Sequence, residues 1–209
     1  HGAAHVALAS RSGRVARDSQ GLEMQLRTLS AASSRVAVTA CDTADASDVC
    51  ALLQEAAGST PSQPLGGVLH AAGAGDKGLI SVINRSRLDW MFAPKALGAW
   101  HVHSCTLATP LRSLVLFSSI ASGLGNVGQA NYAAANAALD ACALSRRAHG
   151  ASASSLQLPL VGGAGMGAAA FDERQMSFKG MAAITLDEYA ICLADALAPA
   201  GALCSVRLV

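Results

Sequence analysis

Short apolar runs alternate with longer stretches that carry a helical repeat of apolar positions over the first two thirds of the chain. The short runs predict strands at residues 5–10, 35–40, 67–70 and 114–118. The longer stretches predict helices near residues 22–29, 47–57 and 85–107. Such alternation is typical of an α/β fold, in which a parallel sheet has helices on both faces.

The last third of the chain predicts two further strands and helices around an irregular stretch. A helix near 131–149, ended by Gly150, precedes a strand near 154–158. Residues 162–180 are rich in glycine and alanine and predict no regular element. Thr185 and Glu188 match a capping box, which predicts a helix start before a last strand at 202–208. No repeat or linker divides the sequence, so we expect one domain over residues 1–209.

Composition favours a compact protein without a polyanionic partner. The chain has 209 residues, of which 52% are hydrophobic, and this is enough to bury one sizeable core. The 15 basic and 14 acidic residues produce no field that would attract nucleic acid or an anionic membrane. No apolar run reaches the roughly 18 residues of a membrane-spanning helix. We therefore expect a soluble protein of the cytoplasm or an organelle interior, not a secreted one.

The residues that commonly bind metals are poorly arranged for it. The six cysteines are widely spaced and form no C-x-x-C pair: Cys41, Cys50, Cys105, Cys142, Cys192 and Cys204. This spacing favours free, buried thiols in a reducing compartment. His101 and His103 lie two residues apart on a predicted helix, so they point to different faces and no shared metal ion is expected.

A Rossmann-like dinucleotide-binding fold begins with a strand, a glycine-rich turn and a helix, and nothing before His5 can supply them. We interpret this as an N-terminally incomplete domain, with residues 1–4 as the tail of the first helix. Gly123, Gly125 and Gly128 do match G-x-G-x-x-G. They follow a late strand and lie among hydroxyl and phenol groups, so we expect them to let a loop pass close to a substrate.

Four polar residues have spacings that point to a reductase. Lys95 precedes Ser119 by 24 residues, Ser119 precedes Tyr132 by 13, and Asn136 follows Tyr132 by four. The segment 118–141 that contains three of them closely resembles the signature of ketoreductase domains of polyketide synthases and animal-type fatty acid synthases. These domains belong to the short-chain dehydrogenase/reductase superfamily. Free-standing members usually carry lysine at the position of Asn136, so the arrangement with Lys95 resembles the synthase-embedded domains.

The chemistry of these residue types agrees with the resemblance. A ketone that receives hydride develops negative charge on oxygen, so the site needs a proton donor and a hydrogen-bond donor. The resemblance assigns these roles to Tyr132 and Ser119. A nearby ammonium, that of Lys95, makes loss of the phenolic proton easier, and Asn136 can hold the lysine or a relay water. Taken singly, each side chain also fits an ordinary structural role, such as a half-buried tyrosine, a strand-end serine or a solvated lysine.

Cofactor contacts are expected where the first three strands end. Arg11, after Ser10, can donate two hydrogen bonds to the ribose phosphate of NADPH, or it can be a solvated turn residue. Asp42 and Thr43 resemble the family's adenine-contacting turn, although Asp42 also fits a plain helix cap. The resemblance places the nicotinamide ribose beside Ala71, Ala72 and Gly73. His70 is interpreted as structural.

The family's markers of product stereochemistry are poorly kept. One type carries Leu-Asp-Asp where this chain has Gly75, Asp76 and Lys77, and the other carries tryptophan at the position of Leu124. The sequence therefore predicts neither configuration of the product alcohol. The resemblance places further substrate contacts at Gln129, Gly163 and Met166. We interpret residues 162–184 as a lid over the acyl chain, since glycine-rich segments can move and exclude water.

The resemblance implies NADPH-dependent reduction of a β-ketoacyl thioester to the β-hydroxyacyl thioester in polyketide or fatty acid biosynthesis. The expected partners are an acyl carrier protein with a phosphopantetheine-linked chain and neighbouring synthase domains. Two alternatives remain open. The chain can be a non-catalytic structural domain of a synthase, since the pyrophosphate-binding turn is absent, or a free-standing short-chain dehydrogenase.

Overall fold

The computed structural model describes residues 3–15, 21–31, 35–58, 64–162, 183–197 and 206–208. Among them are two parallel sheets. The first pairs β1 (His5–Ser10) with β2 (Arg35–Ala40). The second has the order β3-β4-β5-β6, with these bounds: β3 Gly67–His70, β4 Ser113–Ser119, β5 Ser154–Leu158 and β6 Val206–Leu208. The α/β class and the strands at 5–10, 35–40, 67–70 and 154–158 are confirmed.

Among the described residues β1 and β3 do not pair with each other, so the parallel strands form two separate sheets. A doubly wound sheet of order 3-2-1-4-5-6 places its first strand between its second and fourth. The break between β1 and β3 falls at this position. Apolar side chains on the two strands beside the break are exposed to solvent: Leu8 of β1 is 38% exposed and Leu69 of β3 is 49% exposed.

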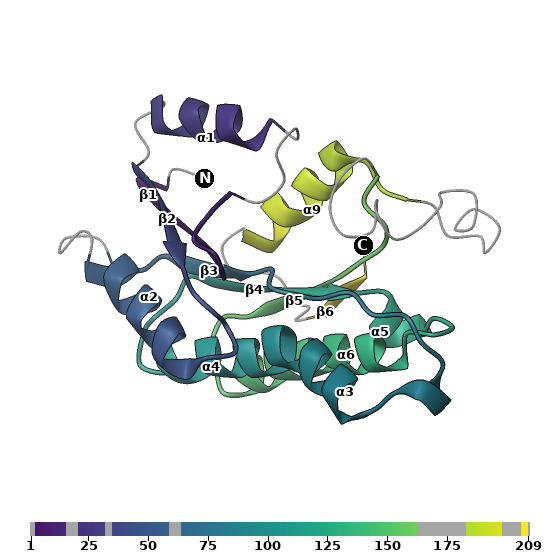
Figure 1. The fold of residues 1–209 in the computed structure, drawn as a ribbon. Coiled ribbons are helices and arrows are strands. Elements are labelled where there is room, and N and C mark those ends of the chain that lie inside the picture. The colour runs from purple at the N-terminus through teal and green to yellow at the C-terminus, as the bar shows by residue number, and fades with distance from the viewer. Residues whose placement is uncertain are drawn as a thin grey trace.

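Helices cover both faces of the strands (Figure 1). One face carries α2 (Ala46–Gly58), α4 (Gly98–Cys105) and α6 (Ala130–Ala148), and the other carries α1 (Leu22–Ala31) and α9 (Leu186–Leu197). Strand β4 supplies the core on both sides. Its Leu114 and Leu116 belong to the cluster with α2, α4 and α6, and the intervening Val115 packs with Ala196 of α9. This alternation follows from the two-residue repeat of a strand.

The helix expected at 85–107 is wrong in its continuity. It consists of α3 (Arg85–Phe92), one π-helical turn η2 (Ala93–Leu97) and α4. Pro94 lies in the second position of the turn and cannot donate the backbone hydrogen bond that an α-helix needs. The wider turn is closed by the N–H of Gly98, which donates to the carbonyl of Ala93.

The capping box is confirmed at the start of α9, where the backbone N–H of Glu188 donates to Thr185 Oγ1 at 3.2 Å and the N–H of Thr185 donates to the Glu188 carboxylate at 2.8 Å. The last strand is described only at 206–208, and residues 202–205 lie outside the described part. Along the described ranges, the helices are all too short or too polar to cross a membrane.

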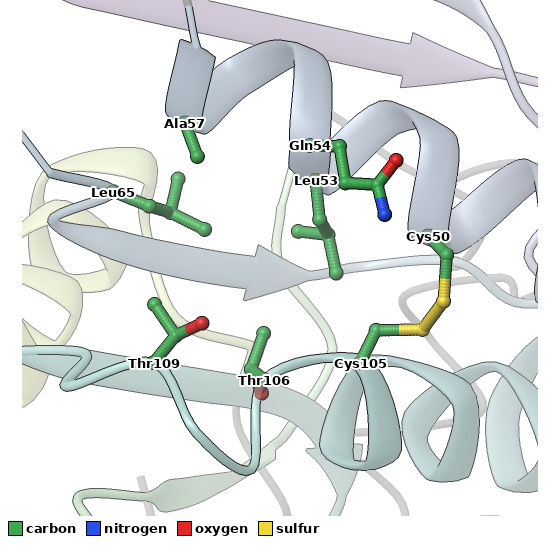
Figure 2. Close-up of a pocket in the computed structure, with 8 residues that line it drawn as sticks. All are labelled: Cys50, Leu53, Gln54, Ala57, Leu65, Cys105, Thr106 and Thr109. Carbon is green, nitrogen blue, oxygen red and sulfur yellow. A yellow bond between two sulfur atoms is a disulfide. The ribbon is translucent and has the colours of Figure 1, made fainter. Parts of the chain in front are cut away.

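The expectation of free thiols is wrong for Cys50 and Cys105, which form a disulfide between α2 and α4. Figure 2 shows this disulfide at one end of a shallow pocket between the two helices, lined also by Leu53, Leu65 and Thr109. The pocket lies where β3 and β4 begin, at the opposite sheet edge from Ser119, where β4 ends. Cys41, Cys142 and Cys192 are free.

Candidate active site

Lys95 is held in the π-helical turn with its side chain inside the protein. Only 4% of its surface is exposed, and its Nζ donates to the carbonyl of Phe117 on β4 at 3.2 Å. Burial lowers the pKa of the ammonium to about 8, against the opposing effect of the Asp140 carboxylate. π-Turns often occur at functional sites, and here the turn carries the single lysine of the predicted set.

Lys95 also faces the predicted acid. Its Nζ lies 5.5 Å from the centre of the Tyr132 ring, within the range of a cation–π contact. The π-turn and the first turn of α6 therefore bring together two residues that are 37 positions apart in the sequence. The predicted proximity of ammonium and phenol is present in the structure.

Asn136 lies one turn after Tyr132 on α6 and is fully buried. Its Nδ2 donates to the carbonyl of Tyr132 at 2.8 Å, and its own backbone carbonyl accepts from Ser118 Oγ at 3.3 Å. The Oδ1 atom is buried without a hydrogen-bond partner among the described residues. Buried amide oxygens are usually paired, so this acceptor is suited to a donor supplied by a ligand or water.

Ser119 ends β4 at the same sheet edge. Its Oγ accepts from the N–H of Ala121 at 3.2 Å, and its carbonyl lies 2.8 Å from Ser122 Oγ, whose single proton it shares with the Asp140 carboxylate. These bonds form the short turn that leads into α5 (Ala121–Leu124). Within the described residues the Ser119 hydroxyl acts as an acceptor, which leaves its proton for donation, as the predicted role requires.

A buried carboxylate that the sequence reasoning missed lies beneath this turn. Asp140 is one helical turn beyond Asn136 on α6 and is 8% exposed. It accepts from Ser122 Oγ at 2.7 Å, from Ser155 Oγ at 2.6 Å and from Gln157 Nε2 at 2.8 Å. The spacing of four from Tyr132 to Asn136 to Asp140 was the available signal.

The loop after β3 is tied to the start of α6. Asp76 accepts from Arg87 Nε at 2.9 Å and from Asn131 Nδ2 at 2.7 Å, and Asn131 precedes Tyr132. The N–H of Gly78 donates to the carbonyl of Gly128 at 2.8 Å. Hydrogen bonds from Arg87 hold the pKa of Asp76 below its usual range. Asp76, which the sequence predicts at the substrate, is thus bonded in the structure to the segment that carries Tyr132.

The glycine-rich motif forms the other side of this contact. Gly125 and Gly128 have φ angles of 71° and 74°, which favour glycine. They lie between α5 and α6, a place that agrees with our interpretation of the motif as a loop near the site.

Leu124 is 67% exposed at the end of α5, and the buried Gln129 accepts from Asn126 Nδ2 at 2.8 Å. Lys77 is exposed in the loop after β3, and the expected contacts Gly163 and Met166 lie outside the described residues.

Arg11 follows β1 and lies against an aromatic ring. Its guanidinium carbon is 5.4 Å from the ring centre of Trp90 on α3. Ser10 stabilises the turn, since its Oγ donates to the carbonyl of Arg14 at 3.0 Å and its carbonyl accepts from the N–H of Gly13 at 3.1 Å. The stacking leaves the planar guanidinium edges able to donate to a phosphate.

Asp42 and Thr43 follow β2, and neither caps the next helix. The cap of α2 is Asp45, whose carboxylate accepts from the N–H groups of Ser47 at 2.7 Å and Asp48 at 3.2 Å. The alternative of Asp42 as a plain helix cap is therefore wrong: its carboxylate accepts from the N–H of Ala44 at 3.0 Å within the preceding turn. Thr43 Oγ1 donates to the carbonyl of Pro94 at 3.3 Å, so this turn touches the π-turn.

Ala71, Ala72 and Gly73 follow β3, and His70 before them is a support of the π-turn. His70 Nε2 lies 3.3 Å from the carbonyl oxygen of Lys95. β1 and β2 run parallel in one sheet and β3 and β4 in the other, and the Thr43–Pro94 hydrogen bond joins the turn after β2 to the π-turn. In open α/β sheets ligands bind outside the carboxyl edge. His101 and His103 contact different partners, Thr43 and Arg146.

Comparison with known proteins agrees with this arrangement. The family model of the KR domain matches residues 1–163. The spectinabilin polyketide synthase system protein NorB of Streptomyces orinoci is 43% identical over 190 residues, which cover 89% of this chain and 8% of that protein. Polyketide synthase GfsB of Streptomyces halstedii is 46% identical over 157 residues, or 75% of this chain and 3% of that protein. The chain thus spans a small part of these relatives.

Solved structures show the same fold. An A1-type ketoreductase has a TM-score of 0.86 at 32% identity over 99% of this chain and 42% of its own length. An A-type ketoreductase from a modular polyketide synthase has a TM-score of 0.84 at 33% identity over the same shares. The chain therefore belongs to the KR domain family, the ketoreductase domains of type I polyketide synthases within the short-chain dehydrogenase/reductase superfamily.

Proposed function

We propose that the chain reduces a β-ketoacyl thioester, carried by an acyl carrier protein, to the β-hydroxyacyl thioester with NADPH. One observation supports the proposal above the others. The buried ammonium of Lys95 lies 5.5 Å from the ring centre of Tyr132. A buried lysine beside a phenol is expensive to maintain for packing alone, but it is what a tyrosine acid needs.

The residues divide the work of reduction. The nicotinamide supplies hydride to the carbonyl carbon when the cofactor is bound. Tyr132 donates its phenolic proton to the carbonyl oxygen as the carbon–oxygen π bond breaks, and Ser119 donates a hydrogen bond to the same oxygen. Lys95 stabilises the phenolate that Tyr132 leaves behind. Asn136 holds the backbone of Tyr132 in place and offers its buried Oδ1 to the donor that returns the proton.

The residues at the carboxyl edge suit a phosphorylated dinucleotide. The Arg11 guanidinium, stacked on Trp90, would donate hydrogen bonds to the ribose phosphate that distinguishes NADPH from NADH. The turn at Asp42 and Thr43 would border the adenine, and Ala71, Ala72 and Gly73 would border the nicotinamide ribose. Their small side chains leave room for a close approach of the cofactor to the backbone.

The proposed partners follow from the relatives, which are polyketide synthases. An acyl carrier protein would bring the thioester to the loop after β3, where Asp76 and Lys77 lie. Neighbouring synthase domains would complete the assembly. Residues 162–184 are proposed as a lid over the acyl chain; of these, 163–182 lie outside the described residues.

The experiment follows NADPH oxidation with a β-ketoacyl-pantetheine substrate in the intact synthase polypeptide. Replacement of Tyr132 by phenylalanine should lower the rate roughly 10²- to 10⁴-fold, because only the acidic proton is lost. Tyr189→Phe is the matched control, since Tyr189 on α9 packs against Phe117 with 6.3 Å between ring centres and has no assigned proton transfer. Equal rates for wild type and Tyr132→Phe would contradict the proposal.

A further inference from the structure

Among the described residues, the groups that donate hydrogen bonds to the buried Asp140 carboxylate are all neutral. Its three hydrogen-bond donors are Ser122 in the turn after Ser119 and two residues of β5, Ser155 and Gln157. Gln157 Nε2 also donates to Ser122 Oγ at 2.9 Å, so the three elements are joined in one network. A buried carboxylate is costly unless its charge is compensated, and hydroxyl and amide donors compensate it only in part.

Lys95 is a positive charge on which the Asp140 carboxylate acts. The Asp140 carboxylate raises the pKa of Lys95, while burial lowers it. Two other titratable groups among the described residues contact Lys95: Tyr132 on α6 contacts its ammonium, and His70 on β3 contacts its carbonyl. His70 is kept neutral by burial, which lowers its pKa to about 4. Among these neighbours, Asp140 is the anion that favours a charged Lys95 near neutral pH.

We propose that Asp140 is a positioning residue of the active site, whose carboxylate anchors the turn after Ser119 to β5 and sets the electrostatic potential at Lys95. The inference rests on the proposed function, because it assigns Asp140 to the support of Ser119 and Lys95 in the same reduction. Tyr132, Asn136 and Asp140 recur every four residues along one face of α6. The helix thus presents the acid, the amide and the supporting carboxylate as one row.

Replacement of Asp140 by asparagine isolates the charge. The Oδ1 of the new amide can accept from Ser122 and Gln157, and its Nδ2 can donate to Ser155, whose hydroxyl only needs to rotate. All three contacts therefore keep their length while the negative charge disappears. Ser155→Ala is the matched control, since it removes one hydrogen bond from the same carboxylate and leaves the charge in place.

The first measurement is the NMR titration of the Lys95 side chain in the full chain, which needs neither cofactor nor substrate. The ammonium of Lys95 should lose its proton at a measurably lower pH in Asp140→Asn than in wild type, because the carboxylate that favours its charged form is gone. Ser155→Ala should titrate like wild type. The charge-swapped variant Asp140→Asn with Gln157→Glu, which keeps both the charge and the hydrogen bond, should recover most of the shift. Coincident titration of folded Asp140→Asn and wild type would overturn the electrostatic role.

The second measurement is the pH profile of NADPH oxidation in the intact synthase. In Asp140→Asn the ammonium is lost at lower pH, so the alkaline fall of kcat should shift to lower pH. Ser122→Ala should lower kcat without shifting the pH at which it falls. If kcat is lower in Asp140→Asn but falls at the same pH as in wild type, Asp140 has a structural role and no electrostatic one. If wild type itself does not oxidise NADPH, the proposed function fails while the titration still decides what Asp140 does to Lys95.

Discussion

The Nε2 atom of His70 lies 3.3 Å from the carbonyl oxygen of Lys95, and both side chains are buried. Burial lowers the pKa of His70 to about 4, so the imidazole is neutral at physiological pH and its Nε2–H can donate to that carbonyl. The histidine thereby supports the π-turn without placing a second cation beside Lys95. The prediction that His70 is structural gains a specific meaning, since the structure it supports is the turn that holds the lysine.

The close packing around this turn depends on Gly98. A Cβ at this position would lie 2.8 Å from His70 Cε1 and 3.0 Å from Thr43 Oγ1. Gly98→Ala should therefore lower the free energy of unfolding by about 1–3 kcal/mol, as overpacking does. Gly58→Ala is the control, because nothing lies within 4 Å of its added Cβ at the end of α2. Urea unfolding of both variants checks the prediction, which is contradicted if they are equally stable.

Loss of the salt bridge between Asp76 and Arg87 should lower kcat/KM more than it lowers the free energy of unfolding. Arg87→Met should lower kcat/KM by roughly tenfold to a hundredfold, because the loop after β3 loses its hold on the start of α6. The control is Arg85→Met, which removes an ion pair with Asp89 on the same helix, with side chains that are 87% and 60% exposed. Such an exposed pair contributes little. Equal kinetics in the two variants would show that the Asp76–Arg87 salt bridge does not position Tyr132.

Lys95 makes both activity and stability depend on alkaline pH. Its pKa falls from 10.5 in the unfolded chain to about 8 in the folded one. Below the folded pKa both states hold the proton and the folded state bears the full cost of a buried charge. Between the two values the folded state releases the proton first, so stability rises with pH. Activity falls over the same window, as the ammonium is lost.

The stability effect is measurable against Lys95→Met. From about pH 7 to about pH 9.5, the unfolding free energy of wild type should rise by about 2 kcal/mol relative to that of Lys95→Met. Denaturant unfolding of both proteins at the two pH values gives this difference, and other titrating groups cancel. A difference that is independent of pH would mean that Lys95 titrates alike in the folded and unfolded chains.

The Cys50–Cys105 disulfide predicts sensitivity to reductant. It links residues 55 positions apart, and the loop-closure model assigns about 4 kcal/mol to a cross-link of this length. The double variant Cys50→Ser with Cys105→Ser should be less stable than oxidised wild type and unaffected by reductant. Two additional thiols should become titratable in denatured wild type after reduction. An unchanged thiol count would show that the two cysteines are not bonded in solution.

Periodicity located most of the strands because a buried strand in a parallel sheet is a short apolar run bounded by turns. It joined α3, η2 and α4 into one helix because apolar positions continue through the interruption. Pro94 was the local signal of the interruption. Its effect could not be placed without the contacts of His70 and Thr43, which come from distant segments.

The predicted pair Lys95 and Tyr132 came from a resemblance in spacing, and their contact depends on two helices whose packing no local pattern reveals. Asp140 was missed for a different reason. An aspartate in a helix is ordinarily solvated, and its burial follows from where Ser122, Ser155 and Gln157 meet. The disulfide left no local signal either, since its two cysteines lie on separate helices.

Strands β1 and β3 each have one side whose N–H and C=O groups pair with no described strand. The side chains of Leu8 on β1 and Leu69 on β3 are partly exposed to solvent. Open edges that also bear apolar side chains promote edge-to-edge association between molecules. A strand that lies between β1 and β3 would pair with both edges and would cover both leucines at once.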